Sequence, residues 1–152
     1  MKVKISKKTK GVAITKVKTT FKPTNLETSG TCASPVEYPR ATADMLKQLF
    51  GEPVFDLANY NGFSDEKVNY EWEFIGSDGS KWTLYDYKEG YIQDDQLVRW
   101  HVGWDGRGDA DAFQEYLHGM INKYFGEEIA ELNRQSEERL RKFYKDNEGV
   151  VL

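Results

Sequence analysis

The chain has 152 residues, a length that fits one domain able to bury about 68–70% of the surface that its unfolded form exposes. Charged residues make up 30%, and no apolar run approaches the roughly 20 residues that a membrane-spanning helix needs. The single cysteine, Cys32, excludes an internal disulfide and a cysteine-ligated metal cluster. The basic start lacks the apolar stretch of a secretory signal. We therefore expect a cytoplasmic protein with no cofactor and no membrane partner.

The charge is strongly segregated along the sequence. Residues 1 to 22 contain eight lysines and no acid, which leaves 13 basic and 25 acidic residues, a formal charge of −12, in residues 23 to 152. Such an arm could neutralise nucleic-acid phosphates, or it could be a solvated hairpin whose lysines protect its edges from aggregation. The candidate nucleic-acid contacts are Lys2, Lys4, Lys7, Lys8, Lys10, Lys16 and Lys18.

The first part of the chain is expected to be an appendage of the domain. Val3 and Ile5 alternate with lysines, a turn follows from Lys7 to Gly11, and the apolar residues from Val12 to Phe21 suggest a second extended run, which together predict a marginal hairpin. Residues 22 to 39 are rich in proline, threonine, serine and glycine and read as a linker or a long surface loop. We therefore assign residues 1–38 to a basic arm and linker, and begin the compact domain at residue 39.

A short helix opens the predicted domain. Thr42 can cap it, and Gly51 followed by Pro53 supplies a stop signal. The apolar residues of this helix fall on one side: Met45, Leu46, Leu49 and Phe50.

Three strands follow. In the first, Tyr70, Trp72 and Phe74 alternate with two glutamates, and the turn at residues 76–79 leads into a second strand at 81–87. The third runs from Val98 to Trp104 and places its apolar side chains opposite Arg99 and His101. The tryptophans are expected in the core. The residues that alternate with them along the strands are expected to form a mixed polar and aromatic surface on the other face.

The last part of the sequence predicts two amphipathic helices. Asp109 is the expected N-cap of the first, whose apolar stripe runs from Phe113 to Tyr124. Gly126 either ends or weakens this helix. Beyond it a thinner stripe recurs among many charges, at Ile129, Leu132, Ser136, Leu140 and Phe143. This helix could pack on the domain as an arm, or pair with a partner or a second copy to form a homo-oligomer.

Together these patterns predict an α+β fold: a three- to four-stranded antiparallel sheet with α-helices packed on one face, a basic N-terminal arm or hairpin, and a C-terminal amphipathic helix. The compact domain is assigned to residues 39–125. The C-terminal amphipathic helix is assigned to residues 126–152.

Motifs for catalysis and metal binding are sparse. His101 is the candidate general acid or base because it shares the polar face of the third strand with Arg99. Whether Asp86 approaches it depends on the sheet register, and the alternative is an ordinary surface histidine. His118 is expected in boundary packing. Two histidines without paired spacing do not fit zinc, and the sequence contains no G-x-S-x-G, Walker or G-x-G-x-x-G pattern. No catalytic or metal-binding residue is assigned.

The glycine-rich loop between the third strand and the next helix has two interpretations. Its backbone N–H groups and Arg107 could bind an anion ahead of the helix. Asp105 and Asp109 flank the loop and oppose this, so we favour a strand-to-helix connection that needs positive φ.

A pattern of aromatic and turn residues covers positions 42 to 120 and resembles a group of small uncharacterised proteins encoded by bacteriophages. The motifs are Leu49-Phe50-Gly51-Glu52-Pro53, Glu71-Trp72-Glu73-Phe74, Asp78-Gly79, Trp82-Thr83-Leu84-Tyr85-Asp86-Tyr87-Lys88 and Trp100-His101-Val102-Gly103. The group supplies no catalytic residues. The resemblance implies an accessory protein in the cytoplasm of the infected host cell, where such proteins inhibit or redirect host machinery.

The leading hypothesis is therefore binding to a host protein, with a bacterial defence system as one kind of target. The predicted protein-binding surface consists of Tyr85, Tyr87, Lys88, Arg99 and His101, with Asp105 and Arg107 at its rim. The first alternative is nucleic-acid binding through the lysine-rich arm. The second is a nucleotide-ligand-binding protein or small enzyme centred on His101.

Overall fold

An antiparallel hairpin forms the centre of the sheet in the computed structural model, which describes residues 18–25, 32–60, 62 and 67–147. Strand β5 (Tyr70–Gly76) pairs with β6 (Lys81–Tyr85), as the alternation of aromatic and acidic residues predicts. Between them, Gly79 takes a φ of 85°, a conformation in which glycine has no steric penalty.

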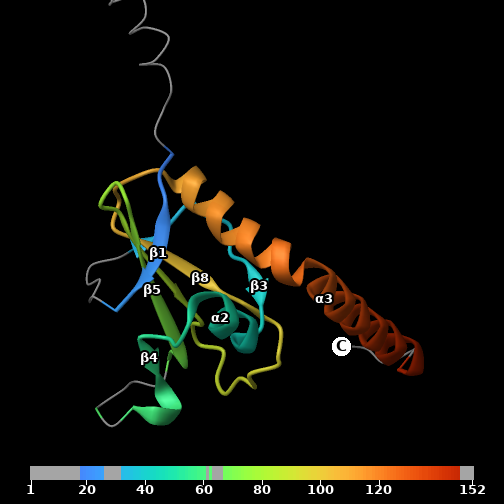
Figure 1. Ribbon diagram of the computed structural model, residues 1–152. Coiled ribbons are helices and arrows are strands. Elements are labelled where there is room, and N and C mark those ends of the chain that lie inside the picture. Colours follow the sequence, from blue (N-terminus) through green and yellow to red (C-terminus); the bar gives the residue numbers. More distant parts are fainter. Residues whose placement is uncertain (1–17, 26–31, 61, 63–66, 148–152) are drawn as a thin grey trace, which may run out of the picture.

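The sheet has six strands. In the order β1-β5-β6-β8-β2, the hairpin is flanked by β1 (Phe21–Thr24), β8 (His101–Trp104) and β2 (Cys32–Ala33). The short strand β4 (Phe55–Asp56) also pairs with β5. A separate two-stranded ribbon joins β3 (Arg40–Ala41) to β7 (Val98–Arg99). All pairings are antiparallel (Figure 1).

The predicted α+β class is confirmed, but the predicted strand number of three to four is wrong. The added strands have two to four residues each and lack alternation, so they form by pairing with longer neighbours. Strands β1 and β2 lie in the segment assigned to the arm and linker. Pro23 is tolerated in β1 because this strand lies at the edge of the sheet. The first strand of the predicted N-terminal hairpin lies outside the described residues.

The predicted third strand is divided at Trp100. Its backbone N–H donates to the carbonyl of Pro39 at 2.8 Å, and its indole Nε1 donates to the carbonyl of Ala41 at 2.8 Å. The residues before Trp100 therefore belong to the ribbon with β3, whereas the residues after it pair with β6.

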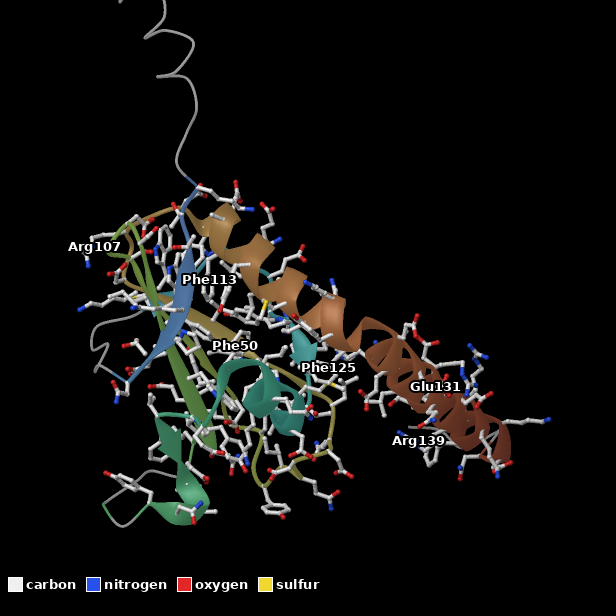
Figure 2. All side chains as sticks on the ribbon, in the orientation of Figure 1. Phe50, Arg107, Phe113, Phe125, Glu131 and Arg139 are labelled. Atoms are coloured by element: carbon white, nitrogen blue, oxygen red, sulfur yellow. The ribbon has the colours of Figure 1, made fainter. Side chains whose placement is uncertain are left out.

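Two helices cover the same face of the sheet and form the core with it. Helix α2 (Ala43–Phe50) begins at the predicted cap, where the Met45 N–H donates to the Thr42 hydroxyl at 3.1 Å. Phe50 meets Phe74 of β5 edge to face, and Phe113 of α3 (Ala110–Asp146) stacks on Trp82 of β6 at 4.4 Å between ring centroids. Figure 2 shows Phe50 and Phe113 on the side of the helices that faces the sheet.

The tryptophans belong to this core, as predicted. Trp72, Trp82 and Trp100 are buried, and the half-buried Trp104 stacks on Trp82 at 5.5 Å. A short 3-10 turn, η1 (Leu57–Asn59), follows β4.

The C-terminal region is one continuous helix rather than two. Helix α3 passes through Gly126 without a break, because the single glycine penalty of about 1 kcal/mol is spread over a long run of good helix formers. From Arg134 to Asn147 every residue is exposed, so this length of α3 leaves the body of the domain. Figures 1 and 2 show it extending past the sheet, with Arg139 on the extension.

Candidate protein-binding surface

The face of the sheet opposite the helices carries a cross-strand row of side chains. Phe55 of β4 is the register partner of Glu71, Glu71 is the partner of Tyr85, and Tyr85 is the partner of His101. All four side chains are half-buried. Because register partners lie on the same face, these strands bring together residues that are up to 46 positions apart in the sequence.

His101 lies among three tyrosine rings. Its ring centroid is 4.6 Å from that of Tyr38, 5.7 Å from that of Tyr85 and 5.8 Å from that of Tyr87. The two rings of Tyr85 and Tyr87 also meet edge to face at 6.4 Å. We call these four residues the tyrosine–histidine cluster. Ring contacts of this kind contribute about 0.5–1.5 kcal/mol each beyond their buried area, so the surface is held in shape before anything binds.

Two cations flank the tyrosine–histidine cluster. The Arg99 guanidinium lies over the Tyr38 ring at 5.0 Å, and the Lys88 ammonium lies over the Tyr87 ring at 5.2 Å. Both cationic side chains are exposed. The structure therefore brings together the predicted residues Tyr85, Tyr87, Lys88, Arg99 and His101.

The other two predicted residues lie elsewhere. His101 begins β8, and Asp105 comes directly after the last residue of this strand. The backbone N–H of Asp105 donates to the carbonyl of Lys81, outside the tyrosine–histidine cluster. Arg107 pairs with Asp105 at 2.9 Å and donates to the carbonyl of Gly79 at 3.1 Å. Burial alone would raise the pKa of Asp105, but the hydrogen bonds from Arg107 outweigh it and lower the pKa. Figure 2 shows Arg107 at the corner of the sheet next to the hairpin turn.

The glycine loop is a strand-to-helix connection. Gly106 and Gly108 have φ values of 86° and 85°, as the favoured interpretation predicts. Asp109 caps α3, because its carboxylate accepts from the Ala112 N–H at 3.1 Å. A carboxylate already at the helix N-terminus opposes an anion there.

Glu71 and Tyr38 belong to this surface and were not predicted. Burial first, then the charge of Glu73 and a hydrogen bond to it, raise the pKa of Glu71 to about 7. Burial also raises the pKa of Tyr85, and Tyr38, Glu71 and Tyr87 add to the effect. The i, i+2 spacing of the two glutamates could have indicated a shared face. Tyr38 gave no signal, because it comes from the segment read as a linker.

The position of Asp86 answers the question of register. Its carboxylate is fully buried and accepts from the backbone N–H groups of Asn69 and Tyr70 at 2.8 and 2.9 Å, and from the Asn69 side-chain amide at 2.7 Å. Asp86 therefore fixes the start of β5. Within the described ranges, His101 has ring neighbours and no carboxylate partner, so the acid–base pair considered for catalysis does not form there.

The second predicted histidine lies at the boundary between α3 and the segment before β3. The His118 Nε2 atom is 2.8 Å from the carbonyl oxygen of Glu37, consistent with boundary packing.

Of the seven candidate nucleic-acid contacts, only Lys18 lies among the described residues. Lys2, Lys4, Lys7, Lys8, Lys10 and Lys16 lie outside the described residues. Lys18 is described, and its ammonium lies 3.6 Å from the carboxylate of Glu115 on α3, with both side chains about three-quarters exposed. An exposed pair of this kind contributes little to stability.

A cavity of about 440 Å³ opens beside β4 and η1. Tyr70 and Asp94 line it, and the Tyr70 hydroxyl donates to Asp94 at 2.6 Å. Lys47, which is not part of the lining, pairs with the same carboxylate at 3.3 Å. The hydrogen bond from Tyr70 and the charge of Lys47 lower the pKa of Asp94 despite its partial burial. Because these polar groups satisfy one another, we rank the cavity below the tyrosine–histidine cluster as a binding site.

Comparison with family models and with curated proteins gives no match to this chain. In the part of the chain that the structure describes, no three histidine, cysteine, aspartate or glutamate side chains gather to hold a metal ion. None of the described helices is long and apolar enough to cross a membrane.

Proposed function

We propose that this chain is a phage-type accessory protein that binds a host protein, such as a component of a defence system, and inhibits or modulates it. The observation that carries the proposal is the tyrosine–histidine cluster on the sheet face opposite the helices. Tyr87 is 40% exposed there, although its ring contacts those of Tyr85 and His101. The phage context rests on the resemblance of the aromatic motifs described above.

The chemistry of the surface supports protein binding over catalysis. Tyrosine and arginine are the residue types on which binding energy concentrates in protein interfaces. Here the tyrosines are held by mutual ring contacts, so little side-chain entropy remains to be lost on binding. His101 contributes an amphipathic ring to this surface, and its contacts are with tyrosine rings rather than with a carboxylate.

Retention of partner proteins from infected cells tests the proposal. The tagged wild-type chain should retain a specific partner, and Tyr87→Ala combined with His101→Ala should lose it. Tyr124→Ala is the matched control, because Tyr124 is an exposed tyrosine of α3 outside the cluster, 57% accessible. Identical partner sets for the wild type and the cluster variant would reject this surface.

A further inference from the structure

Two arginines face each other across the β3–β7 ribbon. Arg40 and Arg99 are register partners, and both side chains are exposed. Like charges directly opposite in a sheet are destabilising, and neither guanidinium can lose its proton at physiological pH. The pair therefore keeps two permanent positive charges at this point of the ribbon.

Neither arginine is neutralised within the described part of the chain. Arg40 donates to the neutral amide oxygen of Asn133 on α3 at 3.0 Å, and Arg99 lies over the Tyr38 ring. No described carboxylate lies within ion-pair distance of either guanidinium. Aromatic and amide partners position a guanidinium without cancelling its charge, so its donors stay available to an incoming anion.

Three of the other arginines pair with carboxylates, whereas Arg139 donates to the Ser136 hydroxyl at 3.2 Å. Arg134 pairs with Glu131 at 2.6 Å and with Glu138 at 3.1 Å. Arg141 lies 3.8 Å from Glu137, and Arg107 pairs with Asp105 as described above. Residues 23 to 152 carry a formal charge of −12, so carboxylates are plentiful. Against this background, two facing arginines without a carboxylate mark a distinct electrostatic site.

Lys88 extends the positive charge across the tyrosine–histidine cluster. Its backbone has a φ of 55°, which is uncommon for a residue with a side chain, and its N–H donates to the carbonyl of Lys67 at 2.8 Å. From Arg99 the contacts run through the rings of Tyr38, His101 and Tyr87 to Lys88, and Arg40, the register partner of Arg99, lies on the side of the ribbon towards α3. We call Arg40, Arg99 and Lys88 the basic band.

We propose that the basic band receives an acidic segment of the partner protein, whose carboxylates bind the Arg40 and Arg99 guanidiniums while its backbone and apolar groups lie on the cluster. This inference rests on the proposed function and adds the chemistry of the partner. The planar guanidinium fork matches a carboxylate in a bidentate manner. Charge complementarity of this kind also speeds association.

A protein segment fits this surface better than a nucleic acid. Three cations form the band, and two glutamates lie close to it. Glu71 is the register partner of Tyr85 in the cluster, and Glu89 follows Lys88 in the sequence. A phosphate backbone would bring a continuous row of charges against these acids and against a body of net negative charge. A short acidic segment needs only a few carboxylates in the right places.

Titration of the full-length chain with labelled ligands tests the inference. The ligands are a short fluorescein-labelled peptide of alternating glutamate and serine, its counterpart with glutamine for glutamate, and a single-stranded oligothymidine, each followed by anisotropy at low salt. The glutamate peptide should bind about tenfold more tightly than the glutamine peptide, the value of one charge-assisted hydrogen bond. Arg40→Gln with Arg99→Gln should remove this difference.

The control variant is Arg139→Gln with Lys142→Gln, which removes the same charge from the exposed length of α3. It should bind the glutamate peptide like the wild type, and thermal unfolding should show both variants folded. Equal affinity for the two peptides, or an unchanged preference in the arginine variant, would overturn the inference. Oligothymidine binding that depends on Arg40 and Arg99 while peptide binding does not would assign the band to nucleic acid instead.

The partner-retention experiment separates this inference from the proposed function. A partner lost by the Tyr87→Ala and His101→Ala variant but retained by the arginine variant would reject the acidic segment and leave the surface in place. A partner retained by both would reject both.

Discussion

At the scale of single residues, the fold changes the protonation of Glu71 within the physiological pH range. Its carboxyl is half-buried on the sheet face opposite the helices, and its pKa of about 7 arises from burial and from Glu73. A pKa that is higher in the folded state means that the folded chain holds a proton that the unfolded chain has already released. Between about pH 4.5 and 7 the folded state therefore loses stability from this group as the pH rises.

Replacement of Glu71 by glutamine should remove this pH dependence. At pH 8 the variant should be more stable than the wild type by about 1–3 kcal/mol, after allowance for the partial exposure of the group. At pH 4, where both states hold the proton, the two should agree closely. Urea unfolding at the two pH values measures the difference, and Glu89→Gln, at an exposed glutamate, is the control. A stability gain of equal size at both pH values would contradict the assignment.

At the scale of elements, α3 combines a packed half with an exposed half. Phe113, Leu117 and Ile121 are buried against the sheet and α2, whereas Leu140 and Phe143 are 54% and 51% exposed. Along the exposed half, ion pairs join residues three or four positions apart, and because their side chains are exposed they add little to stability. Gly126 lies within the packed half, between Phe125 and Ile129, which both pack against the core.

Substitution of Gly126 by alanine should stabilise the protein by about 0.5–1 kcal/mol, because alanine is the better helix former and its Cβ would meet only Asn122 at 3.9 Å. Gly119→Ala, in the packed half and with nothing within 4 Å, should give a similar gain. Chemical denaturation followed by circular dichroism measures both. A gain at Gly119 alone would mean that the helix is interrupted at Gly126 in solution.

The elements also show where sequence reasoning succeeds. The hairpin, the Thr42 and Asp109 caps and the aromatic core follow from local periodicity and capping, so they could be predicted. The short strands could not, because β2 and β4 owe their existence to long-range pairing rather than to their own residues. The continuity of α3 could not be predicted either, because the apolar pattern does not show whether the flanking helix formers outweigh the helix penalty of Gly126.

The candidate site shows the same division. The shared face of Tyr85 and His101 follows from strand parity and was predicted. Tyr38 and Arg40 enter from a segment without periodicity, and the pairing of Arg40 with Arg99 requires the break at Trp100. Asp105 and Arg107 are near His101 in the sequence, but an extended strand of about 3.3 Å per residue carries them to the other end of the sheet.

At the scale of the whole molecule, the core and the exposed half of α3 are separable. The buried residues come from the sheet, α2 and the first part of α3, and Leu132 is the last described residue of α3 that packs against them. The residues from 134 to 147 are exposed, so the loss of this length removes little buried apolar area.

Deletion of residues 134 to 152 should therefore leave a domain that unfolds cooperatively, with a midpoint within a few degrees of the full chain, since a change of 1 kcal/mol shifts the midpoint by about 2–4 °C at this size. Thermal unfolding followed by tryptophan fluorescence reports on the core directly. Deletion from residue 121 is the contrasting variant, because it removes Ile121, which is 2% exposed. Loss of the cooperative transition in the shorter deletion would mean that the exposed half contributes to the core.

The exposed half of α3 also gives the molecule a natural tether. At about 1.5 Å per residue, the helix carries its end roughly 20 Å beyond Asn133, where Arg40 meets α3. A fluorophore or an immobilisation tag attached after Asn147 is therefore held on a stiff spacer, clear of the tyrosine–histidine cluster. Surface-based binding measurements with C-terminally anchored protein should leave both the cluster and the basic band open to partners.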